Sequence, residues 1–246
     1  MNSISPILNI MIKACEKASK VIIRDFGEVE NLQVAKKGPN DFVTKTDKRV
    51  EKILIEELEK SKKSYSFITE ESGTINKSDV DNFWIIDPID GTTNFLHGIP
   101  HFAISIALKN KNEILSGLIF DPIKNEMFYA EKNAGAFFNN HRIRVSKKFE
   151  LEDCLFATNH EGAVHSKLNL RYTGCAALDL AYVANGRLDG YFHNNINLWD
   201  IAAGVLIIKE AGGKVNDINK FDINKINIRA SNNNIYNKML ENLGNF

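Results

Sequence analysis

The chain has 246 residues, in which 31 lysines and arginines balance 31 aspartates and glutamates, so its formal net charge is zero. A neutral chain argues against a general binder of polyanions or anionic membranes. Hydrophobic residues make up 43% and charged residues 25%, as in ordinary soluble globular proteins, which excludes disordered, collagen-like and coiled-coil chains. We expect one domain over residues 1–246, divisible into subdomains at 1–150 and 151–246.

The three cysteines, Cys15, Cys154 and Cys175, are odd in number and far apart, so they form neither a disulfide framework nor a CxxC metal site. The N-terminus lacks a basic region, and Asn9 and Lys13 interrupt the apolar stretch that follows, which argues against a signal peptide. No run approaches the roughly 18–20 apolar residues of a membrane span. These features predict a cytoplasmic protein.

The first half of the chain predicts two helices and then a sheet. Apolar residues spaced three and four apart predict one helix from Ser5 to near Gly27, and a second from Thr46 to the region of residues 60–63. Asp47 then lies in the first turn of the second helix, and residues 38–40 form a turn or hairpin tip between the helices. Apolar runs at 67–68 and 83–86 predict strands, the second stopped by Pro88. Runs at 102–108, 114–120, 127–130 and 136–138 predict an antiparallel meander.

The second half alternates between helices and strands. Residues 175–185 are small and apolar between two glycines, which predicts a buried helix, followed by a strand at 190–192. A further helix is expected at 199–211 and a strand at 214–215. Since no repeat or linker cuts the chain, these elements predict an α+β fold.

Residues 84–95, with the sequence WIIDPIDGTTNF, are the most informative stretch for chemistry. A buried strand delivers Asp87, Pro88 turns the chain, and Asp90 follows just before a helical turn that begins near Gly91 and Thr92. Neighbouring carboxylates repel each other unless a cation neutralises them, and hard oxygen ligands suit Mg²⁺. The free N–H groups of the same loop favour an anion. Alternatively, the two aspartates merely cap a turn.

Three further acids support the site interpretation. Glu70 follows the strand at 67–68, and adjacent parallel strands would bring it beside Asp87. Asp47 and Asp200 each lie near the start of a predicted helix. Each acid has an ordinary structural explanation, as a solvated loop residue or a charge at a helix N-terminus. Together they predict a carboxylate site.

Four motifs occur in the order and approximate spacing of a known family: residues 41–47 (DFVTKTD), 67–72 (FITEES), 84–95 and 199–204 (WDIAAG). On these motifs the chain resembles the inositol monophosphatase family, including its bacterial inositol-1-monophosphatase branch, over nearly its whole length. The resemblance implies a layered α-β-α-β-α sandwich of the type shared with fructose-1,6-bisphosphatase. It also implies a Mg²⁺-dependent phosphomonoesterase that lithium inhibits.

The resemblance also assigns roles to individual residues. It implies two or three Mg²⁺ ions per site, and water attacking phosphorus directly with inversion at that atom. The implied metal ligands are Glu70, Asp87, the Ile89 carbonyl, Asp90 and Asp200. The implied catalytic residues are Asp47, Glu70 and Thr92. The implied substrate contacts are Asp90, Gly91, Thr92, Gly174, Cys175, Ala176, His193 and Asp200.

Two departures from the family pattern concern the substrate. His193 stands where the family usually supplies a glutamate to inositol hydroxyls, and the segment 159–170 is shorter than usual. The leading hypothesis is hydrolysis of inositol 1-phosphate or a related small polyol phosphate. The alternatives are the same chemistry on histidinol phosphate, fructose 1,6-bisphosphate or a 3′-phosphonucleotide, and a non-enzymatic role in a transcription complex. The family also suggests a homodimer, whereas no membrane or general nucleic-acid partner is expected.

Other catalytic motifs are absent from the sequence. His97 and His101 have HxxxH spacing, but Gly98 and Pro100 between them argue against a zinc-binding helix, and no HExxH occurs. No P-loop or GxGxxG motif occurs either. We expect these histidines to be structural or at the surface, together with His141, His160 and His165.

Overall fold

The computed structural model describes residues 4–28, 34–38, 41–159, 168–218 and 225–243, with the backbone alone for 34–38 and 41–44. The first helix, α1 (Pro6–Phe26), begins at Ser5, whose side chain accepts a hydrogen bond from the Leu8 N–H, and ends at Gly27. The antiparallel strands β1 (Val34–Gly38) and β2 (Asp41–Thr44) then lead into α2 (Lys45–Ser61). Both predicted helices are confirmed, while the tip residues Pro39 and Asn40 lie outside the described residues.

A mixed sheet of eight strands forms the centre of the molecule, in the order β10-β9-β8-β7-β6-β5-β3-β4. Strands β3 and β5 run parallel, and the predicted meander from β6 to β9 is antiparallel as expected. The strands are β3 (Tyr65–Thr69), β4 (Gly73–Ile75), β5 (Asp79–Asp90), β6 (Ala103–Asn110), β7 (Glu113–Asp121), β8 (Glu126–Glu131), β9 (Gly135–Phe138) and β10 (His141–Arg142).

A second sheet of five strands, in the order β12-β11-β13-β15-β14, is built by the C-terminal part of the chain. Its strands are β11 (Leu155–Ala157), β12 (Asn169–Arg171), β13 (Gly190–Ile196), β14 (Lys214–Val215) and β15 (Ile226–Ser231). The helices associated with it are α4 (Ala176–Ala184), α5 (Leu198–Glu210) and α6 (Tyr236–Leu243), and a short 3₁₀ turn spans Leu151–Asp153.

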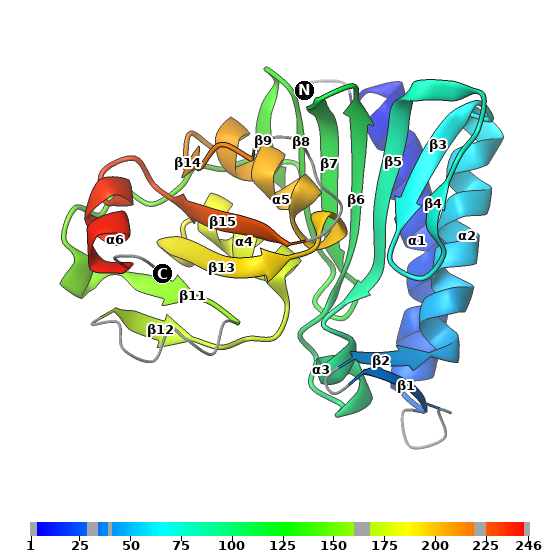
Figure 1. The fold of residues 1–246 in the computed structure, drawn as a ribbon, viewed down its shortest axis with the longest axis horizontal. Coiled ribbons are helices and arrows are strands. Elements are labelled where there is room, and N and C mark those ends of the chain that lie inside the picture. Colours follow the sequence, from blue (N-terminus) through cyan, green and yellow to red (C-terminus); the bar gives the residue numbers. More distant parts are fainter. Residues whose placement is uncertain (1–3, 29–33, 39–40, 160–167, 219–224, 244–246) are drawn as a thin grey trace.

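Three apolar clusters join these elements into five layers. One lies between the helices α1 and α2 and one face of the large sheet, where Trp84 and Ile86 point. A second surrounds α4 and α5 between the two sheets and includes Ile85, which faces the opposite way on the same strand because side chains alternate. The third packs the outer face of the small sheet under α6. The expected α-β-α-β-α sandwich is thus confirmed (Figure 1).

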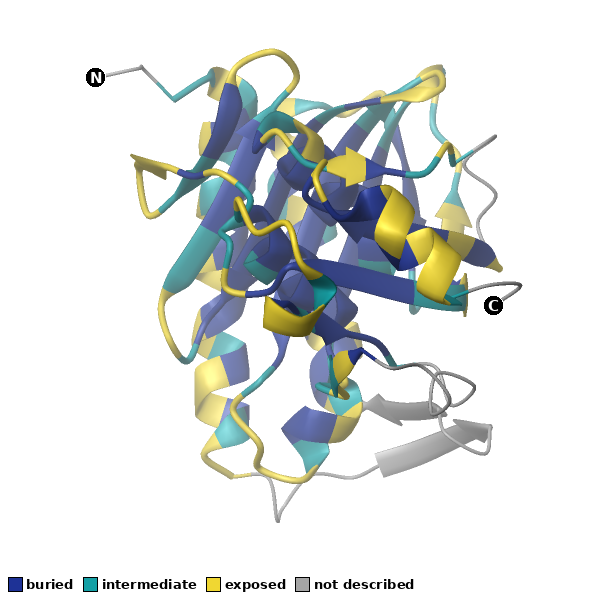
Figure 2. Cartoon of the chain, turned by 90° about the vertical axis from the view of Figure 1, so that its left-hand side faces the viewer, coloured by how far each residue is buried: buried dark blue, intermediate teal, exposed yellow. Residues whose placement is uncertain are grey.

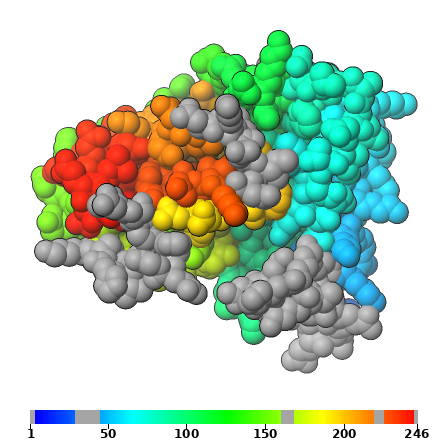
Figure 3. All heavy atoms as spheres, viewed as in Figure 1, coloured from blue at the N-terminus to red at the C-terminus, as the bar shows by residue number. Residues whose placement is uncertain are grey.

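Burial follows this layering. Dark blue positions gather on the strands and on the inward helix faces, and yellow positions lie on the outer turns (Figure 2). In the space-filling view the yellow and orange atoms of the C-terminal part abut the cyan and green atoms of the large sheet (Figure 3). Since the middle cluster draws residues from both parts, the two sheets share one buried layer of helices.

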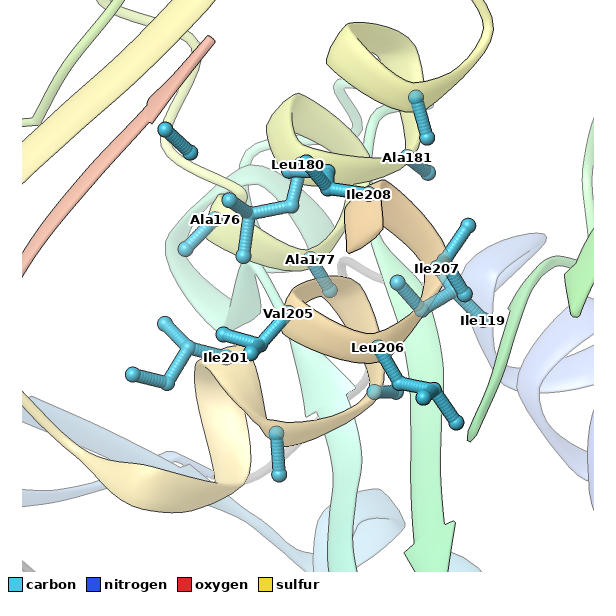
Figure 4. Packing of buried hydrophobic residues seen from close by; sticks show 14 of the residues in the cluster. Ile119, Ala176, Ala177, Leu180, Ala181, Ile201, Val205, Leu206, Ile207 and Ile208 are labelled. Atoms are coloured by element: carbon cyan, nitrogen blue, oxygen red, sulfur yellow. The ribbon is translucent and has the colours of Figure 1, made fainter. Parts of the chain in front are cut away.

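The helices α4 and α5 pack tightly within that layer (Figure 4). Leu180, Ala177 and Ala181 of α4 face Val205 and Ile208 of α5. At Gly204 a Cβ atom would lie 2.5 Å from Cβ of Leu180, so only glycine permits this approach. The close packing fixes where the N-termini of both helices lie.

The structure corrects two predicted strand ends. Pro88 does not stop β5, which continues to Asp90 through a register shift between Asp87 and Asp90. A proline has no N–H to donate, and a bulge requires none at that position, so the strand tolerates it. The strand predicted at 190–192 also extends to Ile196.

Candidate active site

Two acidic side chains meet where the parallel pairing of β3 and β5 ends. Thr69 pairs with Ile86 in the register of these strands, so the next residues, Glu70 and Asp87, are neighbours. The N–H of Glu70 donates to the Ile86 carbonyl at 3.3 Å, which continues the strand geometry by one residue. The predicted meeting of Glu70 and Asp87 is therefore confirmed.

The bulge at the end of β5 arranges the next residues around the same point. The N–H of Ile89 donates to Oδ1 of Asp87 at 3.0 Å, and the Ile89 carbonyl accepts from the hydroxyl of Thr92 at 2.9 Å. A carbonyl has two lone pairs, so the Ile89 oxygen can accept from Thr92 and still serve a cation. The loop folds back on itself and presents Asp90 beside Asp87.

Gly91 makes the turn from β5 into the short helix α3 (Thr92–Leu96). Its φ of 95° lies in the left-handed region that favours glycine. A Cβ atom there would lie 3.0 Å from the His101 carbonyl and 3.3 Å from Cβ of Cys175, so the loop also has no room for a side chain. The backbone of Gly91 thus lies close to the segment that begins α4.

Asp200 reaches the same point from the other half of the chain. It is the third residue of α5 and forms a capping box with Asn197, whose N–H donates to Oδ2 of Asp200 at 3.1 Å. The hydroxyl of Ser105 on β6 donates to the Trp199 carbonyl at 3.2 Å and ties the start of α5 to the large sheet. One carboxylate oxygen from each of Asp87, Asp90 and Asp200 lies within 4.8 Å of the others.

The first turn of α4 supplies donors to Asp90. The N–H of Ala177 donates to Oδ2 of Asp90 at 2.5 Å, and the thiol of Cys175 donates to the same oxygen at 3.2 Å. A helix N-terminus carries unsatisfied N–H groups and partial positive charge, which favours a carboxylate there. The start of α4 therefore fixes both the position and the orientation of Asp90.

Burial raises the pKa values of Glu70, Asp87, Asp90 and Asp200, and neighbouring negative charges raise three of them further. Burial, with the nearby charges of Asp200 and Asp47, raises the pKa of Glu70 to about 9. Burial and the charge of Asp90 raise the pKa of Asp200 to about 7. Burial raises the pKa of Asp90 to about 6, against the lowering effect of the Ala177 N–H. Burial and the charges of Glu70 and Asp90 raise the pKa of Asp87 well above its usual value.

This donor set fits a hard divalent cation. At neutral pH the cluster cannot carry all four negative charges without a compensating positive charge, because like charges in a desolvated site disfavour ionisation. The oxygens come from carboxylates and from one carbonyl, which are the ligands that Mg²⁺ prefers. The cluster is therefore suited to hold metal.

Asp47 lies on a separate element close to these acids. It is buried in the first turn of α2, as predicted, and its charge contributes to the raised pKa of Glu70. The start of α2 is itself held by Asp25 of α1, which accepts from the hydroxyl of Thr46 at 2.7 Å and from Arg49 at 2.9 Å. Helix packing thus presents Asp47 to the cluster.

With this geometry in hand, comparison with known proteins identifies the family. The model of the inositol monophosphatase family matches residues 3–244. The chain belongs to the inositol monophosphatase family. The expected fold and the expected enzyme class, a metal-dependent phosphoric monoester hydrolase, agree with this membership.

Relatives within the inositol monophosphatase family carry two kinds of name. An inositol-1-monophosphatase of Mesorhizobium japonicum is 44% identical over 229 residues, covering 87% of this chain and 86% of the relative. A Nus factor SuhB of Haemophilus influenzae is 42% identical over 243 residues, covering 93% and 90%. The solved structure of the extragenic suppressor protein suhB from Bartonella henselae matches with a TM-score of 0.93 and 45% identity, over 98% of this chain and 99% of that chain.

The remaining residues assigned by resemblance to the inositol monophosphatase family lie at the start of α4 and on β13. Gly174, at a φ of +80°, donates its N–H to the Asn159 side chain at 2.9 Å. Cys175 and Ala176 are buried at the start of α4. His193 is half-buried on β13, on the same face as Tyr191, whose pKa is raised by burial and by the charges of Asp179 and Asp90.

Two residues that support the site are not predicted by the sequence. Asn94 is buried, and its amide donates to the carbonyls of His101 and Thr173, both at 2.8 Å. Asp179 of α4 is fully buried and accepts from the Thr173 hydroxyl at 2.7 Å. Asn94 lies within the 84–95 motif, so its place in that motif could have indicated a role at the site. Asp179 had no signal beyond a lone acid in an apolar helix.

Among the described residues, no histidine joins the group of Asp87, Asp90 and Asp200. His97 and His141 are exposed, and His101 is half-buried with a ring 6.0 Å from that of Tyr182. His160 and His165 lie outside the described residues. The three cysteines are free and buried, and none of the described helices is long and apolar enough to cross a membrane.

Proposed function

We propose that the protein is a Mg²⁺-dependent phosphomonoesterase that hydrolyses inositol 1-phosphate or a related small polyol phosphate. The single observation that carries this proposal is the convergence of Asp87, Asp90 and Asp200, with carboxylate oxygens within 4.8 Å of one another at the meeting point of two halves of the chain. Such a cluster requires positive charge to be fully ionised. The family of the chain gives the class of reaction.

Within this proposal, Glu70, Asp87, the Ile89 carbonyl, Asp90 and Asp200 would hold two or three Mg²⁺ ions. When bound there, Mg²⁺ would neutralise charge on the phosphate and lower the pKa of water. The N–H groups of Gly91 and Thr92 would bind phosphate oxygens, since both belong to the turn that begins α3. Phosphoryl transfer depends chiefly on such positioning and charge neutralisation.

Thr92 and Asp47 would orient the attacking water. The Thr92 hydroxyl donates its proton to the Ile89 carbonyl, which leaves its lone pairs to accept a hydrogen bond from water. The carboxylate of Asp47 would accept the other hydrogen bond and the proton that the water loses as it attacks, and Glu70 would contribute to activation by helping to hold the metal. The new oxygen–phosphorus bond forms as the ester bond breaks, and the departing alkoxide takes a proton from solvent. Inversion at phosphorus is the expected stereochemical outcome.

His193 is the residue that bears most on the choice of substrate. A carboxylate would accept hydrogen bonds from two neighbouring hydroxyls, whereas a neutral imidazole offers one donor and one acceptor. Gly174, Cys175 and Ala176 would contact the substrate from the start of α4. The substrate can therefore be a polyol phosphate that needs fewer acceptors than inositol 1-phosphate.

The experiment is a panel of phosphate esters assayed by phosphate release with Mg²⁺. We expect inositol 1-phosphate to be hydrolysed faster than histidinol phosphate, fructose 1,6-bisphosphate and a 3′-phosphonucleotide. Faster release from one of these three would transfer the proposal to that substrate while keeping the chemistry. Inhibition by lithium in the same assay belongs to the proposal, as do a homodimer and a cytoplasmic location.

A second candidate is a non-enzymatic role in a transcription complex. It is favoured by the name of the Haemophilus influenzae relative, a Nus factor. This role would survive Asp90→Asn, whereas the phosphatase would not. A folded, Mg²⁺-binding protein that releases phosphate from none of the four esters would favour this candidate.

A further inference from the structure

Glu51 is a buried carboxylate that the proposed reaction does not use. It lies on α2, one turn after Asp47, and its residue is 2% exposed. Residues four apart on a helix share a face, so Asp47 and Glu51 both point toward the large sheet. Burying a carboxylate costs free energy unless its oxygens accept hydrogen bonds. The partners of Glu51 therefore indicate why it is there.

Both oxygens of Glu51 bind the turn that follows Glu70. The N–H of Glu71 donates to Oε2 of Glu51 at 2.9 Å, and the hydroxyl of Ser72 donates to Oε1 at 2.5 Å. These donors are the two residues directly after Glu70, and they lie 20 and 21 positions along the chain from Glu51. A single carboxylate on the helix thus clamps the loop on which Glu70 is carried.

The sheet holds the same turn from the other side. Thr69 ends β3 and pairs with Gly73, which begins β4 at a φ of +69°. The hydroxyl of Thr69 donates to the Gly73 carbonyl and accepts from the Ser72 N–H, both at 3.3 Å. These contacts are long and fix the ends of the turn, whereas the shorter contacts to Glu51 fix its middle.

This arrangement links two parts of the candidate site. The helix that presents Asp47 is the helix that holds the loop of Glu70, and α2 is itself anchored to α1 by Asp25. We propose that Glu51 is a positioning residue for the candidate metal site, because it holds the Glu71 N–H and the Ser72 hydroxyl and so fixes Glu70 relative to Asp47. The inference rests on the proposed function, since it assumes that Glu70 is a metal ligand.

The test is a calorimetric titration of Mg²⁺ into the protein without substrate. Partners that orient metal ligands typically contribute about 10–100-fold to metal affinity, so we expect Glu51→Ala to weaken Mg²⁺ binding by about tenfold or more. Glu51→Gln keeps an oxygen acceptor for the Glu71 N–H and should recover most of the affinity. Ser72→Ala, which removes one of the two contacts at an exposed residue, should weaken binding less than Glu51→Ala.

Two control variants on the same helix separate positioning from stability and charge. Leu58→Ala removes a fully buried side chain and should lower the melting temperature without changing Mg²⁺ affinity in the folded protein. Glu56→Ala removes the same charge from an exposed position and should change neither. In a phosphate-release assay, Glu51→Ala should raise the Mg²⁺ concentration for half-maximal rate and leave the KM for ester at saturating Mg²⁺ unchanged.

The outcomes distinguish this inference from the function it rests on. If wild-type protein binds no Mg²⁺, the proposed function fails and the inference fails with it. If wild-type protein binds Mg²⁺ and folded Glu51→Ala binds it equally well, only the inference is overturned. Should Glu51→Ala not fold, unchanged Mg²⁺ affinity in both Glu51→Gln and Ser72→Ala would overturn it.

Discussion

Asp90 differs from the other acids of the cluster because a separate element supplies its hydrogen-bond donors. The Ala177 N–H and the Cys175 thiol both donate to Oδ2 of Asp90, and its pKa rises only to about 6. Glu70, where repulsion from Asp200 and Asp47 adds to burial, reaches about 9. Hydrogen bonds to the ionised form thus lower the pKa of one buried carboxylate relative to its neighbour.

Replacing the thiol with a hydroxyl tests this balance. A hydroxyl is a stronger donor than a thiol, so Cys175→Ser should stabilise ionised Asp90 and lower its pKa, by up to about one unit for about 1 kcal/mol of added hydrogen bonding. Mg²⁺ affinity, measured by calorimetry across pH, should fall at acid pH as Asp90 takes up a proton. This acid limb of Mg²⁺ binding should move to lower pH in Cys175→Ser. Cys154→Ser is the control, because that thiol donates to the Glu150 carbonyl far from the cluster. An acid limb that moves equally in both variants, or toward higher pH in Cys175→Ser, would contradict the account.

Sequence alone identified the acids of the cluster but not their supporting residues. Asp87 and Asp90 lie in one short motif, and Glu70 could be placed beside Asp87 from strand parallelism alone. The donors to Asp90 come from residues 85 and 87 positions away, and no local pattern encodes such a contact. The same holds for Asn94, whose second acceptor is 79 positions away.

Among the elements, α3 has a role out of proportion to its five residues. Its Asn94 donates to the carbonyls of His101 and Thr173, so it links the loop of Gly91 to the segment that begins α4. A Cβ atom on Gly174 would lie 3.1 Å from the Asn94 amide nitrogen, so the two segments are packed closely there. The position of the Gly91 and Thr92 loop relative to α4 depends on this contact.

Asn94→Ala should therefore affect both stability and substrate binding. Two carbonyls lose a donor, at a cost of about 1–3 kcal/mol in the free energy of unfolding. The KM for the phosphate ester should rise, since the loop of Gly91 and Thr92 is no longer held against α4. Urea unfolding and steady-state kinetics measure the two effects, with Asn112→Ala in an exposed turn as the control. Wild-type stability and KM in Asn94→Ala would refute the role of this contact.

Long periodic elements and the short strand β14, which follows a helix end marked by glycines, were predictable from the sequence, whereas β11 and β12 were not. The helices α1, α2 and α5 and the meander strands follow clear apolar periods and local end signals. Strands β11 and β12 have three residues each, too few to show a period, and they exist because neighbouring strands pair with them. The continuation of β5 past Pro88 depends on its pairing with β6, a tertiary contact that outweighs the local effect of proline.

At the scale of the whole molecule, a chain of zero net charge concentrates negative charge at the meeting point of its two sheets. Without metal, the folded protein holds protons on these acids that the unfolded chain, with ordinary carboxyl pKa values, would release. Between the ordinary carboxyl range and about pH 9, where Glu70 titrates, the folded state thus binds more protons than the unfolded state. Raising the pH through this window must therefore favour unfolding.

Thermal unfolding in a chelator should show this dependence. From about pH 5.5 to 8.5 the melting temperature should fall. The free energy of unfolding should decrease by up to about 1.4 kcal/mol per pH unit for each proton retained in the folded state. Mg²⁺ should restore most of the loss, because it binds the folded state only. Asp87→Asn, which removes one charge from the cluster, should be more stable than wild type at high pH in chelator. Stability that rises over this window in chelator, or that Mg²⁺ leaves unchanged, would contradict the electrostatic account.

The central claim, that the carboxylate cluster is a Mg²⁺ site for phosphate ester hydrolysis, is tested most directly by phosphate release from inositol 1-phosphate. Wild-type protein and folded Asp87→Asn should be compared with Mg²⁺ and with chelator. We predict release by wild type with Mg²⁺, and a loss of at least about 100-fold in chelator and in Asp87→Asn. Equal release in chelator, or undiminished release by Asp87→Asn, would contradict the claim.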